Sequence, residues 1–530
     1  MTPKETIEQG RAVLGIELGS TRIKAVLTDG ENKPIAQGSH EWENQLADGL
    51  WTYSLEAIWH GLQACYASLR SDVARRYSVE IESLAAMGIS AMMHGYMAFD
   101  SRGEILVPFR TWRNTNTGSA AAALGKLFHY NIPLRWSISH LYQCVLDGED
   151  HVRNIDFLTT LAGYVHWKLT GERVLGVGDA SGMIPVDPLT KDYDATMVEK
   201  FDTLVSGKDF PWKLRDILPG VLTAGQQAGC LTSEGADLLD VSGHLRQGIP
   251  LCPPEGDAGT GMTATNSVRQ RTGNVSAGTS SFSMIVLEKE LSKPYEAIDM
   301  VTTPDGSLVA MVHCNNCTSE LNAWVGIFRE YEELIGLPAD MDALYGTLYN
   351  HAMTGDADCG GLVSFNFISG EPVAGLMTDG RPLFVYSATD NFNLANFMRA
   401  NLYASVAVLK LGNDILLREE NVAVDRITGH GGLFKTKGVG QRVLSAALNS
   451  PISVMETAGE GGAWGMALLA SYMLRSGGRT LADWLDEDVF AGDKGTEVRP
   501  TGEEVEGFNR YMESYRRALP IEMSAVKYKN

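Results

Sequence analysis

A carboxylate set among glycines is the residue of this sequence best suited to take a proton from a substrate. The segment Glu255-Gly256-Asp257-Ala258-Gly259-Thr260-Gly261 surrounds Asp257 with small residues, which let a ligand approach the backbone closely. Transfer of a phosphoryl group to an alcohol requires a general base of this kind. Asp257 could instead cap a helix that begins near Ala258, and the two roles are compatible.

Two short turns could donate hydrogen bonds to phosphate groups. Gly19-Ser20-Thr21 lies within Leu18–Leu27, and Gly278-Thr279-Ser280 lies within Ala277–Val286. Each reads as a strand, a turn of glycine and two hydroxyl residues, and a returning strand. Backbone N–H groups and hydroxyls suit phosphate oxygens, and Lys24 could add a positive charge. The structural alternative is a pair of plain hairpins.

The repetition of this turn about half a chain later favours an internal duplication. Strands and helices also alternate along the sequence, which is typical of an α/β protein. We therefore expect two similar α/β domains facing a shared cleft, with a boundary near residues 266–271. The charged stretch after about residue 476 is expected to be a peripheral helix and a loose end.

Two further segments have side chains that could hold a sugar. Met92-Met93-His94-Gly95 follows a predicted strand, and Trp112-Arg113-Asn114 follows Pro108. Tryptophan can cover the apolar face of a sugar, while arginine and asparagine can bond its hydroxyls. The structural alternatives are a buried, satisfied histidine and a loop anchored by one tryptophan.

Composition and absent motifs narrow the function. The 530 residues carry a formal charge of −21, so nucleic acid is a poor partner. Neither GxxxxGK[ST] nor a GxGxxG after a strand occurs, which disfavours a P-loop NTPase and a nicotinamide oxidoreductase. The N-terminus does not resemble a secretory signal, and the longest apolar runs are too short for a membrane span.

The seven cysteines are scattered and odd in number, as expected of free thiols in a reducing cytoplasm. Cys314 and Cys317 form a CxxC without a second pair, which is weak support for zinc or redox chemistry. Two small residues in a packed strand-to-helix corner are the favoured interpretation. The remaining predicted elements are strands at Val13–Leu18, Ile23–Thr28, Leu84–Ser90 and Tyr96–Asp100, and helices at Thr52–Arg70, Ile155–Leu169, Asn391–Leu417, Gly438–Asn449 and Ala463–Met473.

Taken together, the segments from about Leu14 to Tyr472 resemble the FGGY carbohydrate kinases of the actin-like ATPase superfamily. Any one of the matching segments is common, whereas five in the family's order are specific. They are Gly15–Thr21, Gly273–Ser280, Gly361–Glu371, Thr428–Gly432 and Gly461–Ala467.

The resemblance implies two actin-like (ribonuclease H-like) domains related by duplication, with a cleft between them. Residues 12–268 would be the N-terminal, sugar-binding domain and residues 269–480 the C-terminal, ATP-binding domain. Residues 481–530 would be a peripheral tail.

The resemblance also assigns roles to residues, with Asp257 as the catalytic base. The implied sugar-binding residues are Met93, His94, Trp112, Arg113, Asn114 and Asp257. The implied ATP-binding residues are Gly19, Ser20, Thr21, Lys24, Gly278, Thr279, Gly431 and Gly432. Glu17 would hold Mg²⁺, partly through water.

Within the family, Met92–Gly95 is most similar to the xylulokinase segment, so the implied reaction converts D-xylulose and ATP to D-xylulose 5-phosphate. Three residues depart from the pattern: Glu17 and Asn114 stand where aspartate is usual, and Met92 stands where glutamine is. The alternatives are a kinase for ribulose, another ketose or a polyol, then a non-catalytic actin-like nucleotide binder, and third an oxidoreductase. The expected partners are a small sugar and ATP, with no nucleic acid or membrane; a homodimer is one expected assembly.

Overall fold

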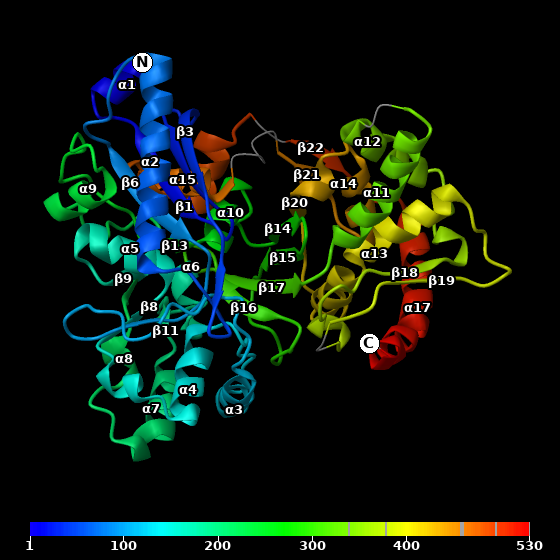
Figure 1. Ribbon diagram of the computed structural model, residues 1–530, viewed down its shortest axis with the longest axis horizontal. Helices are drawn as coiled ribbons and strands as arrows, with labels where there is room; N and C mark the ends of the chain where they lie inside the picture. The colour runs from blue at the N-terminus through cyan, green and yellow to red at the C-terminus, as the bar shows by residue number, and fades with distance from the viewer. Residues whose placement is uncertain (338–339, 377–378, 456–460, 493–494, 529–530) are drawn as a thin grey trace. The chain divides into compact units, whose positions relative to one another are not determined.

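The computed structural model describes residues 1–337, 340–376, 379–455, 461–492 and 495–528 (Figure 1). Its internal contacts divide the chain into two compact units. The first unit consists of residues 1–268, 300–309 and 460–491. The second unit consists of residues 269–299, 310–459 and 492–530. Both are α/β, as the alternation of strands and helices predicts.

A five-stranded sheet forms the centre of the first unit, in the order β13-β6-β1-β2-β3. β1 is antiparallel to β2, and β2 is antiparallel to β3, whereas β1 is parallel to β6 and β6 is parallel to β13. The bounds are β1 Val13–Leu18, β2 Arg22–Thr28, β3 Pro34–Glu41, β6 Ala86–Ala91 and β13 Glu255–Gly256. β1 is buried over nearly its full length, as expected of a strand covered on both faces.

Helices pack closely on this sheet where the strands carry glycine. α2 (Leu55–Tyr77) lies against β3, and a Cβ at Gly38 would overlap the backbone of Cys65 and Leu69. α15 (Gly461–Arg475) lies against β1 in the same way, because a Cβ at Gly15 would overlap the backbone of Ala463 and Ala467. In Figure 1 the orange α15 lies among the blue strands. The glycines therefore set the distance between sheet and helix.

The sheet of the second unit repeats the first. β14 is antiparallel to β15 and parallel to β20, and β20 is parallel to β21. The order β21-β20-β14-β15-β17 corresponds to β13-β6-β1-β2-β3, which supports the predicted duplication. The bounds are β14 Thr272–Ala277, β15 Ser281–Val286, β17 Leu308–Cys314, β20 Arg426–His430 and β21 Ile452–Val454, with β16 Asp299–Thr302 beside β17 and β22 Thr496–Val498 beside β21 at the two edges.

Several elements differ from their expected positions. The helix expected over Ile155–Leu169 is a short strand, β8 (Phe157–Thr159), followed by α5 (Leu161–Thr170), because Thr160 caps α5 through the N–H of Gly163. The helix expected after about residue 476 is present as α17 (Gly502–Ala525), but its Tyr511 and Tyr515 are fully buried, so it is packed rather than peripheral. α15 was expected in the C-terminal domain of 269–480, but it belongs to the first unit because it covers β1.

The remaining elements divide between the two units. In the first they are α1 Pro3–Glu8, β4 Gln45–Ala47, β5 Leu50–Thr52, β7 Met97–Phe99, α3 Gly118–Phe128, α4 Ser137–Asp147, β9 Val174–Gly176, α6 Val177–Ala180, β10 Val186–Asp187, β11 Asp192–Tyr193, α7 Ala195–Val205, α8 Leu214–Ile217, β12 Gly220–Leu222, α9 Ser233–Leu239, α10 Asp257–Ala264 and α16 Leu481–Trp484. In the second they are α11 Ser319–Leu334, α12 Met341–Ala352, β18 Val363–Phe365, β19 Leu383–Val385, α13 Leu394–Asp414 and α14 Val439–Leu448.

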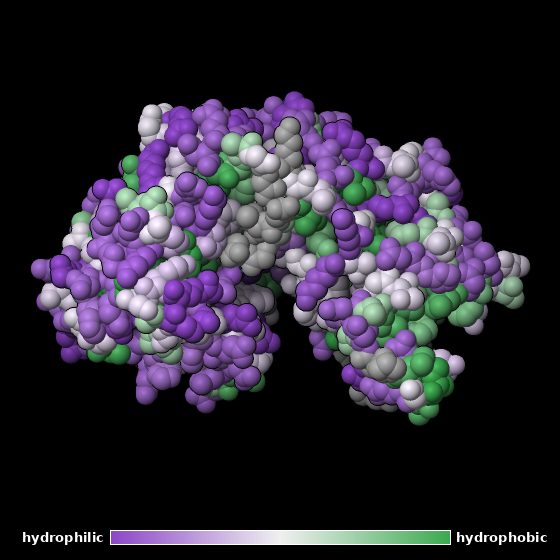
Figure 2. Space-filling view, turned by 90° about the horizontal axis from the view of Figure 1, so that it is seen from above, coloured by the Kyte–Doolittle hydropathy of each residue, from purple (hydrophilic) through white to green (hydrophobic). Residues whose placement is uncertain are grey.

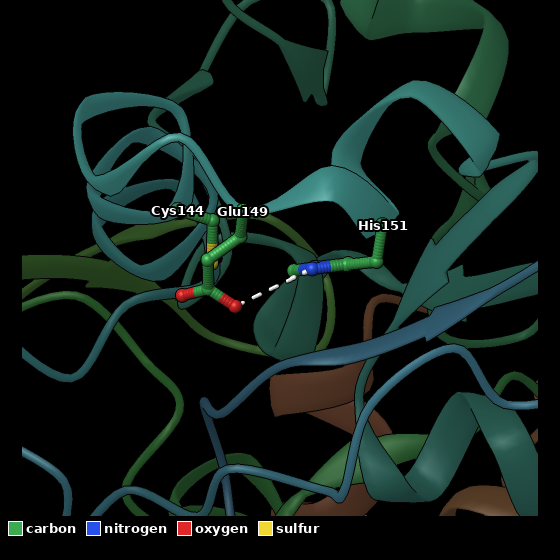
Figure 3. Close-up of side chains that lie close together, drawn as sticks. All are labelled: Cys144, Glu149 and His151. Carbon is green, nitrogen blue, oxygen red and sulfur yellow. Dashed lines mark ion pairs between the residues drawn. The ribbon is translucent and has the colours of Figure 1, made fainter.

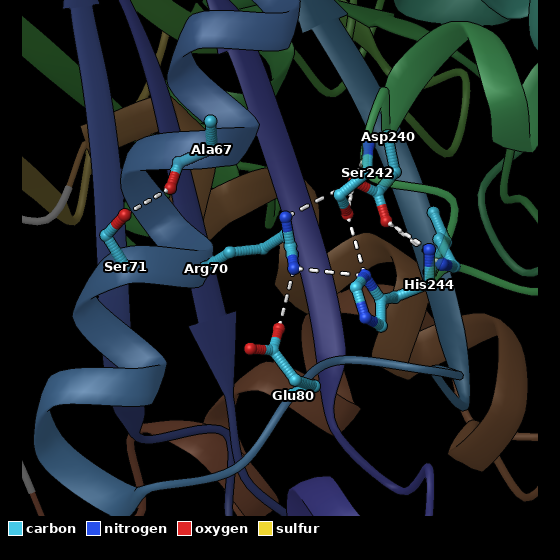
Figure 4. A network of polar contacts seen from close by, with 8 residues as sticks. Ala67, Arg70, Ser71, Glu80, Asp240, Ser242 and His244 are labelled. Carbon is cyan, nitrogen blue, oxygen red and sulfur yellow. Dashed lines mark hydrogen bonds and ion pairs between the residues drawn. The ribbon is translucent and has the colours of Figure 1, made fainter.

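A buried aspartate fixes the loop that follows α9 (Figure 4). The carboxylate of Asp240 accepts hydrogen bonds from the backbone N–H groups of Ser242, His244 and Leu245. It also lies 3.6 Å from a guanidinium nitrogen of Arg70 on α2. Burial acts to raise the pKa of Asp240, but these hydrogen bonds and the Arg70 charge outweigh it and hold the pKa below its usual value.

Hydrophilic side chains cover much of the face drawn in Figure 2, in keeping with the charge of −21. Among the described residues, no helix combines the length and the apolar character that crossing a membrane requires.

Candidate active site

Asp257 lies at the point where β13 ends and α10 begins. Gly256 is the N-cap, so Asp257 is the first residue of the helix rather than its cap. This corrects the expectation that it might cap a helix from Ala258. Its Oδ1 accepts the backbone N–H of Met93 at 3.3 Å, and its side chain is exposed. The protein packed around the carboxylate impedes its hydration and raises its pKa to about 6, against backbone N–H groups that lower it.

Two buried carboxylates lie close to Asp257. Glu255 accepts the N–H groups of Gly178 and Asp179 at 3.2 and 3.0 Å, which ties α6 to β13. Burial raises its pKa to about 8, with the Asp179 charge adding to the effect. Burial also raises the pKa of Asp179 to about 7, against a hydrogen bond from the Thr160 hydroxyl, and the Asp257 charge raises it further.

The sequence predicted no role for Glu255 or for Asp179. Their position beside Asp257 depends on β13 and α6 meeting, and these are far apart in sequence. A second carboxylate two residues before Asp257 was the one local signal that could have drawn notice to Glu255.

Met93 and His94 lie beside Asp257. The side chain of Met93 packs against Gly256, where a Cβ would overlap the Met93 Cγ. Nδ1 of His94 lies 3.0 Å from the Gly182 carbonyl oxygen. Because a carbonyl only accepts, Nδ1 carries the proton, which makes Nε2 an acceptor in the neutral ring. His94 has a φ of +69°, in the left-handed region that residues other than glycine seldom adopt, so the surrounding structure must hold its backbone in this conformation.

The loop with Trp112 connects the expected sugar site to the first turn. The indole N–H of Trp112 donates to Ser20 Oγ at 3.1 Å. The guanidinium of Arg113 lies 3.7 Å above the ring of Trp51, where a cation–π contact is favourable.

Asn114 has other partners than the expected sugar hydroxyl. It is 4% exposed, and its amide bonds both the N–H and the carbonyl of Trp51 and the carbonyl of Thr111. Its side chain thus holds the loop in place rather than facing a ligand.

Glu17 and Lys24 lie opposite one another on β1 and β2. Burial raises the pKa of Glu17 to about 7, the Asp257 charge adds to this, and Lys24 and the backbone N–H of Ala463 oppose it. Glu17 and Asp257 therefore interact electrostatically within the first unit, with Lys24 as the nearby cation. Two carboxylates that hinder each other's ionisation form a set of oxygen donors to which a divalent cation is well suited.

The carbonyl groups of the first turn point into the protein. The Gly19 carbonyl accepts the indole N–H of Trp42 at 2.7 Å, and the Ser20 carbonyl accepts the hydroxyl of Tyr53 at 2.5 Å. The Thr21 carbonyl accepts the backbone N–H of Trp42. These bonds fix the orientation of the turn's peptide groups.

The second turn is held in a similar way. The carbonyl of Gly278 accepts from the N–H and hydroxyl of Thr318, and the carbonyl of Thr279 accepts the N–H of Cys317. Gly431 lies beside this turn with φ +104°, and a Cβ there would stand 2.5 Å from the Ala277 carbonyl oxygen. Only glycine suits such a conformation and approach. Gly432 follows it and begins a short 3₁₀ turn, Gly432–Phe434.

The structure thus places the expected residues in two groups, one in each unit. The first unit holds Glu17, Gly19, Ser20, Thr21, Lys24, Met93, His94, Trp112, Arg113, Asn114 and Asp257. The second unit holds Gly278, Thr279, Gly431 and Gly432.

A cluster that could suggest a metal lies elsewhere in the first unit. Figure 3 shows the side chains of Cys144, Glu149 and His151 close together. Arg110 donates from one guanidinium nitrogen to Cys144 Sγ at 3.0 Å and from another to Glu149 at 2.5 Å. Burial raises the pKa of the Cys144 thiol to about 12. The guanidinium supplies the positive charge here, so we interpret the cluster as a buried ion pair.

Cys314 and Cys317 are both buried at the corner between β17 and α11. This matches the interpretation of a packed strand-to-helix corner. Through its N–H, Cys317 also helps to hold the second turn.

Comparison with known protein families identifies the family of this chain. The N-terminal domain of the FGGY family of carbohydrate kinases matches residues 12–261, and the C-terminal domain of the same family matches residues 273–474. Together these matches cover most of the sequence. The chain belongs to the FGGY family of carbohydrate kinases.

Individual relatives are distant. The chain is 22% identical over 292 residues to the xylulose kinase of Escherichia coli K12, covering 54% of this chain and 56% of that protein. It is 23% identical over 265 residues to the L-fuculokinase of Salmonella typhi, covering 46% of this chain and 50% of that protein. The matched region therefore spans about half the length of these relatives.

Solved structures match along nearly the whole chain. The gluconate kinase of Lactobacillus acidophilus superposes with a TM-score of 0.78 at 16% identity, covering 97% of this chain and 99% of that one. The ligand-bound xylulose kinase of the same organism gives a TM-score of 0.76 at 16% identity, with 96% and 98% covered. These likenesses establish the two-domain carbohydrate kinase fold.

Proposed function

We propose that the protein is an ATP-dependent sugar kinase in which Asp257 is the general base. The observation that carries this proposal is the placement of Asp257, which is exposed at the start of α10 and bonded to the N–H of Met93 beside His94. A pKa of about 6 leaves the carboxylate ionised at neutral pH and near the value at which a base works best.

The acceptor sugar would bind in the first unit, next to Asp257. His94 would accept a hydrogen bond from a sugar hydroxyl through Nε2, in the ring form that its Nδ1 contact favours. Trp112 would cover an apolar face of the sugar. Asn114 would act by holding the loop through Trp51.

Asp257 would take the proton of the attacking hydroxyl. The new bond joins the sugar oxygen to the γ-phosphorus as the bond from that phosphorus to the β-phosphate oxygen breaks, leaving ADP and a sugar phosphate. Positioning and charge neutralisation account for most of the catalysis in such a transfer.

The phosphates of ATP would be held by the two glycine turns. Their carbonyls are bonded within the protein, so the turns can present N–H groups and hydroxyls to a ligand. Lys24 would add a positive charge beside the first turn. Gly431 and Gly432 would let the adenosine approach the backbone in the second unit.

Mg²⁺ fits the donors of the first unit. Glu17 and Asp257 are carboxylates that raise the cost of one another's ionisation, and a divalent cation relieves that cost. When bound, Mg²⁺ would neutralise phosphate charge. Glu17 would hold it, with its carboxylate oriented by the N–H of Ala463 at the start of α15.

The proposed acceptor is a ketopentose, with D-xylulose first. The resemblance of Met92–Gly95 to xylulokinases and the similarity to the E. coli xylulose kinase support this choice. Two of the residues that depart from the xylulokinase pattern have a structural role. Met92 lies in the hydrophobic core, and the side-chain amide of Asn114 donates a hydrogen bond to a backbone carbonyl. Ribulose, another ketose or a polyol is the second candidate, because the L-fuculokinase similarity is of the same order.

The test is ADP release with Mg-ATP against a panel of ketopentoses, other ketoses, aldoses and polyols. Strong stimulation by D-xylulose supports the proposal as stated. Stimulation by a different sugar keeps the kinase and replaces the substrate. ATP binding without sugar-dependent ADP release would instead favour a non-catalytic nucleotide binder.

The seven unpaired cysteines support the further proposal that the protein works in a reducing cytoplasm.

A further inference from the structure

Three segments of the first unit meet around the imidazole of His94. They are the turn that contains the histidine, the start of α4 and the short segment that follows α6. The carbonyl oxygen of Gly182, after α6, lies 3.0 Å from Nδ1 of His94. The N–H of Ile138 on α4 donates to the carbonyl of Met183 at 3.1 Å. The segment after α6 is thus joined both to the histidine and to α4.

A buried indole lies against the His94 ring. Trp136, the N-cap of α4, is stacked with the imidazole at 6.4 Å between ring centroids and an interplanar angle of 21°, within the range of favourable aromatic pairs. Trp136 is fully buried, and its indole N–H has no hydrogen-bond partner among the described residues. The indole is therefore held by packing, which includes His94 and, at an angle, Tyr130, and not by a hydrogen bond.

The residues on either side of Trp136 hold the backbone of the histidine turn. The carbonyl of Arg135 accepts the N–H of Gly95 at 3.2 Å, and the hydroxyl of Ser137 donates to the carbonyl of Gly95 at 2.6 Å. Both polar backbone groups of Gly95 are thus bound to the start of α4. The left-handed backbone of His94 persists only where its surroundings stabilise it, and these two bonds contribute to that.

The Nδ1 edge of the imidazole is approached closely by Gly182. A Cβ at residue 182 would stand 2.7 Å from Nδ1 of His94 and 2.8 Å from Cε of Met93, so only a residue without a side chain leaves room for both. The ring is therefore fixed at one edge by the glycine carbonyl and is stacked with Trp136. These two contacts together define its plane.

We propose that Trp136 is a positioning residue for His94 and thereby sets the affinity for the acceptor sugar. The lone pair of Nε2 lies in the ring plane, so a tilted imidazole would misalign its hydrogen bond with a sugar hydroxyl, and misalignment weakens such a bond steeply. Because the indole is fully buried, it acts through His94 and not by contact with the sugar. This inference rests on the proposed function, which supplies the sugar that the ring orientation serves.

The test is the steady-state kinetics of Trp136→Leu with the best acceptor of the sugar panel. The KM for the sugar should rise about tenfold, as for the loss of one well-made hydrogen bond, while kcat and the KM for ATP stay within about twofold. Trp136→Phe keeps a ring against His94 and loses only an N–H that has no partner, so its sugar KM should stay within about threefold of wild type.

Trp484→Leu is the matched control for the loss of a buried indole. Trp484 is also fully buried in the first unit, where it lies on α16 and packs against Tyr472. The two leucine variants should lower the thermal midpoint to a similar extent, because each removes a buried ring. Only Trp136→Leu should raise the sugar KM. An equal rise in Trp484→Leu would show a general effect of instability and would overturn the proposal.

A double-mutant cycle tests whether the effect passes through His94. His94→Asn removes the imidazole and suits the left-handed backbone, which asparagine tolerates. In that background Trp136→Leu should change the sugar KM by less than about twofold, because the ring that it positions is gone. A change as large as in the wild-type background would show that the two residues act independently, and would overturn the proposal.

The tautomer of His94 provides a readout that needs no turnover. In nitrogen NMR of protein with isotope-labelled histidine, His94→Asn identifies the signals of this ring. Nδ1 should carry the proton in the wild type and in Trp484→Leu, whereas Trp136→Leu should populate the Nε2–H form as well. A wild type without sugar-dependent ADP release would refute the proposed function; the tautomer change would then still support the role of Trp136, and an unchanged tautomer would overturn it.

Discussion

The substitution Gly15→Ala tests whether the close approach of α15 to β1 holds the first unit together. A Cβ at residue 15 would overlap the backbone oxygen of Ala463 and the nitrogen of Ala467, and would stand 3.1 Å from the Cα of Ala467. All three are backbone atoms of one helix, so no side chain can rotate out of the way. At a normal contact of ~3.5 Å, α15 would have to withdraw from β1 by about 1 Å or more.

Such a withdrawal should cost about 2–3 kcal/mol of unfolding free energy, in the upper part of the range measured for overpacked cores. It should also lower the thermal midpoint of the first unit by about 5 °C. The matched control is Gly30→Ala, because a Cβ at Gly30 meets nothing within 4 Å. Turnover should fall as well, because Glu17 lies two residues along β1 and its carboxylate accepts the N–H of Ala463 on α15.

The assay is urea unfolding followed by circular dichroism, read as two transitions if the units unfold separately. A Gly15→Ala midpoint equal to that of Gly30→Ala would show that α15 does not depend on this approach, and the packing argument would be refuted.

Three further predictions follow from single sites. The pKa of Asp257 is about 6, so the carboxylate becomes protonated and can no longer act as a base as the pH falls below that value. We therefore expect kcat/KM to drop about tenfold per pH unit below pH 6. A value of kcat/KM that does not change between pH 4.5 and 7 would contradict the assignment of Asp257 as the base. Asp240→Ala leaves three backbone N–H groups without their acceptor and removes one of the two carboxylates that pair with Arg70, and should lower the unfolding free energy by about 3 kcal/mol in urea titration, with the exposed Asp237→Ala as the neutral comparison. Trp112→Phe keeps an aromatic ring but loses the bond to Ser20 Oγ, and should lower kcat/KM about fivefold at ~1 kcal/mol per hydrogen bond; an unchanged value would separate that bond from catalysis.

Much of the fold could be predicted because its signals are local. The strand–turn–strand pattern at Gly19 and again at Gly278 corresponds to β1–β2 and β14–β15. The helical spacing of apolar residues also predicted α14 to within a residue or two of its bounds. Asp257 stood out because glycines surround it, and the structure puts it at a strand-to-helix junction.

What the sequence did not reveal depends on contacts between distant segments. α15 belongs to the first unit because Gly15 and Gly465 let it lie against β1 and α10, and no local pattern reports that pairing. The residue type of Asn114 predicted a contact with the sugar, but its side-chain amide forms hydrogen bonds with the backbone of Trp51, more than sixty residues away in the sequence. The burial of Glu255 likewise follows from α6 folding over β13.

The most direct test of the central claim is Asp257→Asn assayed with Mg-ATP and the best acceptor of the sugar panel, with Asp237→Asn as the matched control. An amide at position 257 still accepts the N–H of Met93 but cannot take up the hydroxyl proton. The account predicts that sugar and ATP still bind and that kcat falls by at least ~10²-fold, while the control keeps wild-type turnover. Turnover that survives intact in Asp257→Asn would contradict the assignment of the base.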